Sequence, residues 1–320
     1  MVYLIYNINH IYMESCPICP TQKIAIIGAG AVGATTAYTL MLKNLAAEIM
    51  LIDVNEAKEE GEVMDIDDIL SFVETGCIKG GDFKDAANAD IIVLTAGAAQ
   101  KPGETRLDLV NKNKAICQSI FKGIGKIKST AIIVVVANPV DIITSLVQNL
   151  SGLDRSHVFG TGTGLDTARL RTEVGKALGV SAKNVDGYVL GEHGDTEFDA
   201  FSTVSVGGIA MKDLKLPKAK LKEIEEKVKN AAYEIINRKG ATFYGIAMTV
   251  ADIVEAILLN QHRIMPLSVH LDGWNGISGV CLSAPVVLGR QGVEKVWPVK
   301  LSSSEKKRLQ KSAKEIKKYL

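Results

Sequence analysis

Cysteine is scarce in this sequence, and the five cysteines that occur are scattered along the chain. An odd, scattered set argues against a disulfide framework and favours a reducing compartment, so we expect a cytoplasmic protein. Cys16 and Cys19 form a Cys-x-x-Cys pair, but zinc would need two more ligands at close spacing, and none follows. The sequence therefore predicts no metal site.

An excess of charge of one sign is also missing, because 37 basic and 36 acidic residues leave a formal net charge of +1. No global field attracts nucleic acid or an anionic membrane, so any recognition of an anion has to be local. The sequence has no apolar run long enough to cross a bilayer. These absences argue against nucleic acid and membrane as partners and leave a small molecule as the expected one.

Residues 1–22 differ from the rest of the chain. They begin with apolar and aromatic residues, but they lack the basic start and the long apolar run of a signal peptide. We expect a loose N-terminal arm that is possibly disordered, and Met13 is an alternative to Met1 as the true start.

The first half of the remaining chain alternates strand and helix patterns. Short, largely apolar runs at 23–27 and 48–52 are predicted strands, and the continuous runs at 91–95 and 131–136 are typical of buried strands. The segments 31–43, 56–69 and 107–124 are typical of helices. Such a succession predicts an α/β fold with a Rossmann-type doubly wound parallel sheet and right-handed crossovers. We assign this first, Rossmann-type domain to residues 23–160.

After about residue 160 the pattern changes to a mixture of helices and short strands. Helices are predicted at 166–178, 218–238, 245–259 and 305–319, and strands near 185–190, 201–206, 264–270 and 280–288. The mixture predicts an α+β catalytic and substrate domain over residues 161–320. Ser302 and Glu305 have the spacing of a capping box, and the last helix should pack on the surface.

Three glycines between the first predicted strand and the first helix have the spacing Gly-x-Gly-x-x-Gly, namely Gly28, Gly30 and Gly33. They allow a tight turn and a close approach of the backbone to a pyrophosphate, which the N–H groups of the helix start can bind. Asp53 follows the second strand, where a carboxylate accepts from ribose hydroxyls and repels a 2′-phosphate. The pattern predicts an NAD site and disfavours NADP; a glycine turn that binds nothing is the alternative.

His193 stands out among the five histidines because it lies in the run Gly191-Glu192-His193-Gly194-Asp195. Flanking glycines let the ring and the backbone approach a ligand closely. Asp166 and Arg169 are three residues apart in a predicted helix, so they project from one face. Arg169 is suited to clamp a carboxylate, and Asp166 to orient His193 and raise its pKa, although an ordinary surface pair is the alternative.

A polar loop rich in glycine and proline, residues 97–106, follows the strand at 91–95. Folds of this kind bind ligands at the carboxyl ends of their parallel strands, so the loop is placed to close over a site and to bring a guanidinium to a developing alkoxide. Asn138 ends the next strand at the same edge and offers an amide donor. A plain surface loop and a simple turn are the alternatives.

Five motifs, in this order and spacing, resemble the L-lactate/malate dehydrogenase family. They are Gly-Ala-Gly-Ala-Val-Gly at 28–33, Gln-Lys-Pro-Gly-Glu-Thr-Arg at 100–106, Ala-Asn-Pro-Val at 137–140, Leu-Asp-Thr-Ala-Arg at 165–169 and Gly-Glu-His-Gly-Asp at 191–195. The similarity extends over nearly everything from Lys23 to the C-terminal helix. It implies an NAD-dependent dehydrogenase of small 2-hydroxy acids that assembles as a homotetramer or dimer.

The resemblance also implies a role for each matching residue. His193 would be the general acid/base, giving its proton to the substrate oxygen while a hydride passes to C2. The catalytic set would be His193, Asp166 and Arg106. The substrate-binding set would be Arg169, Gln100, Asn138 and Thr242. The NAD-binding set would be Gly28, Ala29, Gly30, Ala31, Val32, Gly33, Asp53, Thr95, Ala96, Gly97 and Asn138.

Gln100 occupies the position that discriminates between substrates in the family. Malate-type members generally carry Arg there, and lactate-type members carry Gln. A closed pocket of low dielectric penalises the second, unpaired carboxylate of oxaloacetate, which Gln cannot neutralise. We therefore expect pyruvate and L-lactate as the substrate pair, with malate dehydrogenase and larger apolar 2-oxo acids as alternatives.

Two positions depart from the family pattern. Gly164 stands just before Leu165, where relatives often carry a larger residue. Asp186 stands where many bacterial relatives carry a His that binds fructose 1,6-bisphosphate together with an Arg, which here matches Arg171. An acidic side chain should repel the phosphate, so we expect little or no activation by the sugar bisphosphate.

Two further classes of protein are alternatives. An NAD-dependent glycosidase on a related fold would need a Cys/His metal site near the nicotinamide, and no such pair is evident in the sequence. A non-catalytic structural relative would require none of the set His193, Asp166, Arg169 and Arg106, so their joint presence argues for an enzyme.

Overall fold

The structure is a computed structural model that describes residues 22–45, 48–98 and 106–320, without the side chain of Arg106. The expected N-terminal arm, with Met13 and the Cys16–Cys19 pair, lies outside the described residues except for Gln22. Most of the polar loop, including Gln100, lies outside them as well.

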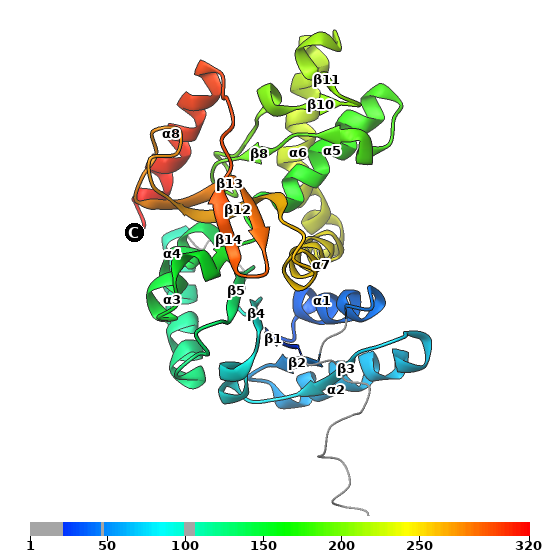
Figure 1. The fold of residues 1–320 in the computed structure, drawn as a ribbon, viewed down its shortest axis with the longest axis vertical. Coiled ribbons are helices and arrows are strands. Elements are labelled where there is room, and N and C mark those ends of the chain that lie inside the picture. Colours follow the sequence, from blue (N-terminus) through cyan, green and yellow to red (C-terminus); the bar gives the residue numbers. More distant parts are fainter. Residues whose placement is uncertain (1–21, 46–47, 99–105) are drawn as a thin grey trace, which may run out of the picture.

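One sheet of nine strands runs through the molecule in the order β14-β13-β12-β6-β5-β4-β1-β2-β3 (Figure 1). Six neighbouring strands are parallel and form the predicted doubly wound sheet: β1 (Lys23–Ile27), β2 (Glu48–Ile52), β3 (Cys77–Gly80), β4 (Ile91–Leu94), β5 (Ile132–Val135) and β6 (Val158–Gly160). Three antiparallel strands from the end of the chain extend it: β12 (Arg263–Leu271), β13 (Val280–Gly289) and β14 (Gly292–Val296). The Rossmann-type α/β fold is thereby confirmed.

The helices of the first half connect the parallel strands: α1 (Ala31–Leu42), α2 (Glu56–Asp67), α3 (Arg106–Ile124) and α4 (Val140–Leu150). Those of the second half are α5 (Gly164–Leu178), α6 (Lys218–Lys239), α7 (Tyr244–Leu258) and α8 (Ser303–Lys317). Small strands lie between α5 and α6: β7 (Val185–Asp186), β8 (Val189–Leu190), β9 (Phe198–Asp199), β10 (Ser205–Val206) and β11 (Ile209–Ala210). The second half is therefore a mixture of helices and mainly antiparallel strands, as predicted.

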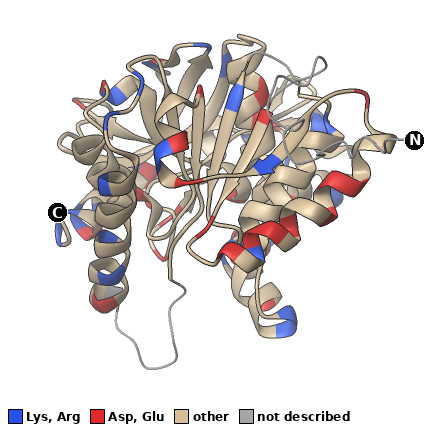
Figure 2. Ribbon diagram, turned by 90° about the horizontal axis from the view of Figure 1, so that it is seen from below, with Lys and Arg blue, Asp and Glu red and all other residues tan. Residues whose placement is uncertain are grey.

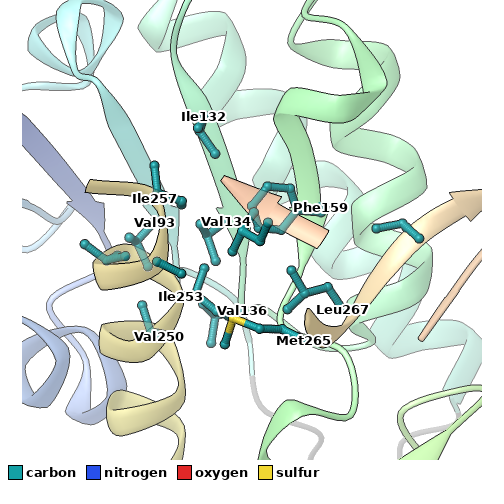
Figure 3. Close-up of a cluster of buried hydrophobic side chains, with 14 of the residues drawn as sticks. Val93, Ile132, Val134, Val136, Phe159, Val250, Ile253, Ile257, Met265 and Leu267 are labelled. Carbon is teal, nitrogen blue, oxygen red and sulfur yellow. The ribbon is translucent and has the colours of Figure 1, made fainter. Parts of the chain in front are cut away.

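The core lies where α7 and β12 of the second half cover the parallel strands. Figure 3 shows Val93, Val134 and Phe159 of β4, β5 and β6 facing Ile253 of α7 and Leu267 of β12, and all five side chains are fully buried. Burial of a large apolar side chain contributes about 1.5–3 kcal/mol. This shared core binds the two halves of the chain into one body.

Some expectations from the sequence were wrong or incomplete. The predicted strand at 201–206 is a 3-10 turn at Phe201–Thr203, and only Ser205–Val206 is extended. The helix α4 and the strands β3, β6 and β14 had no counterpart among the predicted elements. The last helix behaves as expected, since the Ser302 hydroxyl accepts from the N–H of Glu305 at 3.3 Å and a Glu305 carboxylate oxygen accepts from the N–H of Ser302 at 2.7 Å.

The cysteines need one correction. Cys117 and Cys281 are buried free thiols, whose pKa values burial raises to about 11 and about 12. Cys77 is disulfide-bonded, which runs against the expectation of a reducing compartment.

Charge is distributed over the surface as the composition predicts. Figure 2 shows both basic and acidic residues on the surface of that view, whereas α2 (Glu56–Asp67) is mainly acidic. Within the described ranges, no helix has the length and apolarity needed to cross a membrane.

Candidate active site

The predicted glycine turn joins the end of β1 to the start of α1. The N–H of Gly28 donates to the carbonyl of Ile52 at 2.7 Å, and the hydroxyl of Thr95 donates to the carbonyl of Gly28 at 2.9 Å. A Cβ at Gly33 would lie 1.8 Å from the carbonyl oxygen of Gly28, so only glycine fits there. A Cβ at Gly30 would meet nothing within 4 Å, so this glycine leaves open space beside the helix start.

That open space fits a pyrophosphate. No side chain caps the N-terminus of α1, and its first turn carries no acidic residue, so its N–H groups and the positive end of the helix dipole face the turn. A cavity of about 490 Å³ adjoins it, lined among others by Gly28, Gly30, Asp53, Thr95, Ala96 and Gly97. Six residues of the predicted NAD-binding set therefore meet at one cavity.

Asp53 is fixed at the end of β2 beside this cavity. Its carboxylate accepts from the N–H of Ala29 at 2.7 Å and from the N–H of Asn55 at 3.0 Å. The backbone N–H of Asp53 donates to Glu59 at 2.7 Å, which holds the carboxylate in place. A carboxylate in this position is suited to bind the ribose hydroxyls and disfavours a 2′-phosphate.

A second cavity, of about 340 Å³, lies at the carboxyl ends of β5 and β8 and along α5 and α6. Its lining brings together four of the predicted site residues, which are Asn138, Asp166, Arg169 and His193. Leu109, Tyr233 and Ile236 add an apolar wall that the sequence did not point to. Polar groups converging in a partly apolar cavity are typical of a small-molecule site.

His193 and Asp166 form the closest pair in this second cavity. The imidazole Nδ1 of His193 lies 2.7 Å from Oδ2 of Asp166, and Asp166 is 2% exposed. Burial lowers the pKa of His193, but the charge and hydrogen bond of Asp166 outweigh it and raise the pKa to about 9. Burial raises the pKa of Asp166, but His193 and Arg169 outweigh it and hold that pKa below its usual range. The pair therefore keeps a proton on the imidazole at neutral pH.

Arg169 shares the same carboxylate. Its Nη1 donates to Oδ1 of Asp166 at 2.8 Å, and its side chain is 14% exposed. The alternative of an ordinary surface pair is excluded by this burial. The guanidinium lies beside His193 in the cavity, which is the arrangement needed to hold a carboxylate next to a proton donor.

Glu197 is a third carboxyl group at this cavity. One of its oxygens lies 3.9 Å from Nδ1 of His193, and its side chain is 8% exposed. Burial and repulsion by Asp166 raise its pKa well above the usual value. Asp166, His193 and Glu197 offer metal-ligating atoms within 4.8 Å of one another, but the His193–Asp166 hydrogen bond already uses two of these atoms, which suits proton transfer better than metal binding.

The structure says less about the position of the other predicted site residues relative to the second cavity. Asn138 accepts from the N–H of Val140 at 3.3 Å through its side chain, and it lines the second cavity. Arg106 is the first residue of α3, with its side chain outside the described part, and Gln100 lies outside it altogether. Thr242 lies between α6 and α7 and is not among the residues that line the described cavity.

Comparison with known proteins agrees with this geometry. Residues 22–160 match the family model of the lactate/malate dehydrogenase NAD binding domain, and residues 163–320 match that of the lactate/malate dehydrogenase alpha/beta C-terminal domain. The chain belongs to the lactate/malate dehydrogenase family. Its first half is accordingly an NAD-binding unit, and the protein is an NAD-dependent L-2-hydroxy acid dehydrogenase.

Individual relatives within the family are similar over most of their length. The L-lactate dehydrogenase of Clostridium botulinum strain 657 is 47% identical over 306 residues, covering 94% of this chain and 96% of the relative. The L-lactate dehydrogenase of Acetivibrio thermocellus is 45% identical over 308 residues, covering 93% and 96%.

Solved structures of lactate dehydrogenases have the same fold. A lactate dehydrogenase from a Medee basin deep-sea metagenome library superposes with a TM-score of 0.90 at 39% identity, covering 93% of this chain and 98% of that one. The minor L-lactate dehydrogenase of Enterococcus mundtii, in a ligand-bound form, superposes with a TM-score of 0.90 at 41% identity, covering 93% and 97%.

Proposed function

We propose that the protein is a cytoplasmic L-lactate dehydrogenase that interconverts pyruvate and NADH with L-lactate and NAD⁺. The observation that carries the proposal is the pairing of the His193 imidazole with Asp166, beside Arg169, in one cavity. Bound NADH supplies the hydride that adds to C2 of pyruvate. As the C2–O double bond is reduced, the oxygen takes the proton from the imidazole of His193. A second acidic group is not required, because Asp166 stabilises the imidazolium without taking the proton itself.

We assign the remaining roles as follows. Arg169 binds the substrate carboxylate through its guanidinium, and Asn138 faces both the substrate and the nicotinamide. Arg106 polarises the carbonyl of the substrate, and Thr242 lines the pocket. These roles rest on the positions of Arg169 and Asn138 in the second cavity and on the family motifs for the rest.

Gln100 supports pyruvate as the substrate. The described cavity already contains the carboxyl groups of Asp166 and Glu197, so a second substrate carboxylate would add a further negative charge to a buried site. Arg169 is engaged with Asp166 and is the carboxylate clamp, so it does not neutralise a second charge. Malate dehydrogenase, with the same proton transfer, is the alternative.

In this proposal the two halves of the chain have different roles. Residues 23–160 bind NAD, and residues 161–320 supply most of the groups that act on the substrate.

We further propose that the enzyme assembles from identical copies, as a tetramer or a dimer. The helix α1 packs against α7 (Figure 1), and large apolar side chains on α1, α7, α2 and the 3-10 turn Asp68–Phe72 that follows α2 are exposed. A second copy of this surface is the expected cover, because soluble proteins rarely leave large apolar patches open. Sedimentation equilibrium tests this, and a monomer at micromolar concentration would contradict it. The residues concerned are Tyr38, Leu42, Met64, Phe72, Tyr244 and Met248.

One experiment tests the reaction itself. NADH oxidation is followed at 340 nm with pyruvate and with oxaloacetate in parallel, at equal enzyme concentration. Pyruvate should give the higher kcat/KM. A preference for oxaloacetate would favour malate dehydrogenase, and no turnover of either acid would favour a non-catalytic relative.

A further inference from the structure

Asp141 is a buried carboxylate that the proposed reaction does not use. It is the second residue of α4, three residues after Asn138, and it is 1% exposed. Its Oδ2 accepts a hydrogen bond from the backbone N–H of His193 at 2.8 Å, and its Oδ1 accepts one from the hydroxyl of Ser268 at 2.5 Å. Asp141 therefore joins the start of α4, the loop of His193 and the strand β12 at one point.

These contacts are specific enough to fix the carboxylate. Burial raises the pKa of Asp141 to about 6, and the hydrogen bonds from Ser268 and His193 oppose that rise. A buried carboxyl group is costly unless its oxygens are hydrogen-bonded, and here each oxygen has a donor. The side chain is therefore held from two sides, and it holds its two partners in turn.

The loop that carries His193 needs such restraint from outside. Gly191 has φ +94° and Gly194 has φ +157°. Glycine adopts these backbone conformations easily, but it adopts many others as well, so the glycines alone do not hold the loop in place. Gly191 is restrained by two backbone hydrogen bonds with Ser283 of β13, of 3.2 and 2.9 Å. Asp141 restrains the N–H of His193 itself, from the side of the sheet edge where Asn138 lies.

We propose that Asp141 is a positioning residue for proton transfer, which fixes the main chain of His193 to the start of α4 and so sets the separation of the imidazole from Asn138. The inference rests on the proposed function, in which His193 carries the proton and Asn138 faces the nicotinamide. Among the described residues that line the two cavities, Asp141 is not present, so it acts through His193 and touches neither substrate nor cofactor.

Three variants distinguish this positioning role from general support of the fold. Asp141→Ala removes both hydrogen bonds, Asp141→Asn keeps an oxygen acceptor of the same shape, and Ser268→Ala removes only the second partner. A proton donor displaced by about 1 Å costs about 10²-fold in rate. We therefore expect Asp141→Ala to lower kcat about 30- to 100-fold, with the Kd of NADH within about twofold of wild type.

The two other variants act as matched controls. Asp141→Asn and Ser268→Ala should keep kcat within about fivefold, because the N–H of His193 retains its acceptor. If Asp141→Ala does not fold, Asp141→Ser replaces it, with an expected loss of about tenfold because its hydroxyl is too short to reach both partners. Equal losses of kcat and of NADH affinity in the folded variant would overturn the positioning role.

A readout without substrate separates this inference from the proposed function. Spectra of enzyme with ¹⁵N-labelled histidine report the hydrogen bond between Nδ1 of His193 and Asp166, whose atoms are 2.7 Å apart. The His193 signal should shift or broaden in Asp141→Ala and stay close to wild type in Ser268→Ala. An unchanged His193 signal in Asp141→Ala overturns the inference. If the wild type fails to reduce pyruvate, the proposed function is overturned, but the spectra still test whether Asp141 positions His193.

Discussion

The imidazole Nδ1 of His193 lies 2.7 Å from a carboxylate oxygen of Asp166, and the same carboxylate binds Arg169 through its other oxygen. One buried group thereby orients both the proton donor and the carboxylate clamp. The pKa of His193, raised from 6.5 to about 9, makes this relationship measurable.

Pyruvate reduction should depend on pH through His193. The reaction needs the protonated imidazole, so kcat/KM should be constant at neutral pH and fall as pH rises through about 9, while lactate oxidation rises over the same range. Because the folded-state pKa of His193 is raised, its protonation contributes stability that is fully present below pH 6.5 while Asp166 stays ionised, and that is lost as pH rises through about 9. Rate profiles and denaturant titrations over this range measure both. In Asp166→Asn the break should move toward 6.5, and a break that does not move would assign the titration to another group.

Two glycines of the NAD turn should respond oppositely to the same added methyl group. In Gly33→Ala the Cβ would lie 1.8 Å from the carbonyl oxygen of Gly28, so we expect a loss of stability of about 1–3 kcal/mol. In Gly30→Ala the Cβ meets no protein atom within 4 Å, so thermal stability should stay near wild type while NADH affinity falls. Thermal unfolding and NADH fluorescence titration measure the two effects. Normal NADH affinity in Gly30→Ala would argue against a pyrophosphate in this space.

Gln100→Arg should change the substrate preference. A guanidinium would neutralise the second carboxylate of oxaloacetate, so kcat/KM for oxaloacetate should rise and that for pyruvate should fall. Both are measured by NADH oxidation. Gln100→Asn serves as the control that changes length without charge, and an equal effect in both variants would show that charge does not decide the preference.

Fructose 1,6-bisphosphate should have little or no effect on the enzyme at neutral pH. Asp186 is exposed on β7, and Arg171 of α5 donates to the carbonyl of the adjoining Gly187 at 3.3 Å. Asp186→His replaces the repelling carboxylate with a phosphate-binding group, so it should introduce activation. The half-saturating concentration of pyruvate, with and without the effector, is the measurement; a large drop in the wild type would refute the charge argument.

The parts of the site that the sequence predicts are those formed by neighbours along the chain. Gly28, Gly30 and Gly33 meet at one turn because their spacing is local, and Asp166 and Arg169 meet because they are one helical turn apart. The pairing of His193 with Asp166 spans 27 residues and was predicted from their chemistry and the family motifs.

The residues that the sequence did not point to are those whose role depends on distant packing. Asp141 contacts His193 and Ser268, which are 52 and 127 residues away in the sequence, and no periodic sequence pattern indicates such a contact. Glu197 follows the histidine motif by two residues, but its burial against His193 depends on how β9 pairs with β8. The strands β3 and β14 lack the continuous buried run of the predicted strands because several of their residues are exposed, and β6 has only three residues.

The continuous sheet has a consequence for how the enzyme unfolds. The strands of the first half meet those of the second where Gly160 of β6 is paired with Ser268 of β12, and α7 and β12 share one core with β4, β5 and β6. The two halves should therefore melt in a single cooperative transition. The NAD-binding unit is the first half, yet by mass action NADH binding should delay the exposure of Trp274 and Trp297 in the second half as strongly as that of any first-half probe.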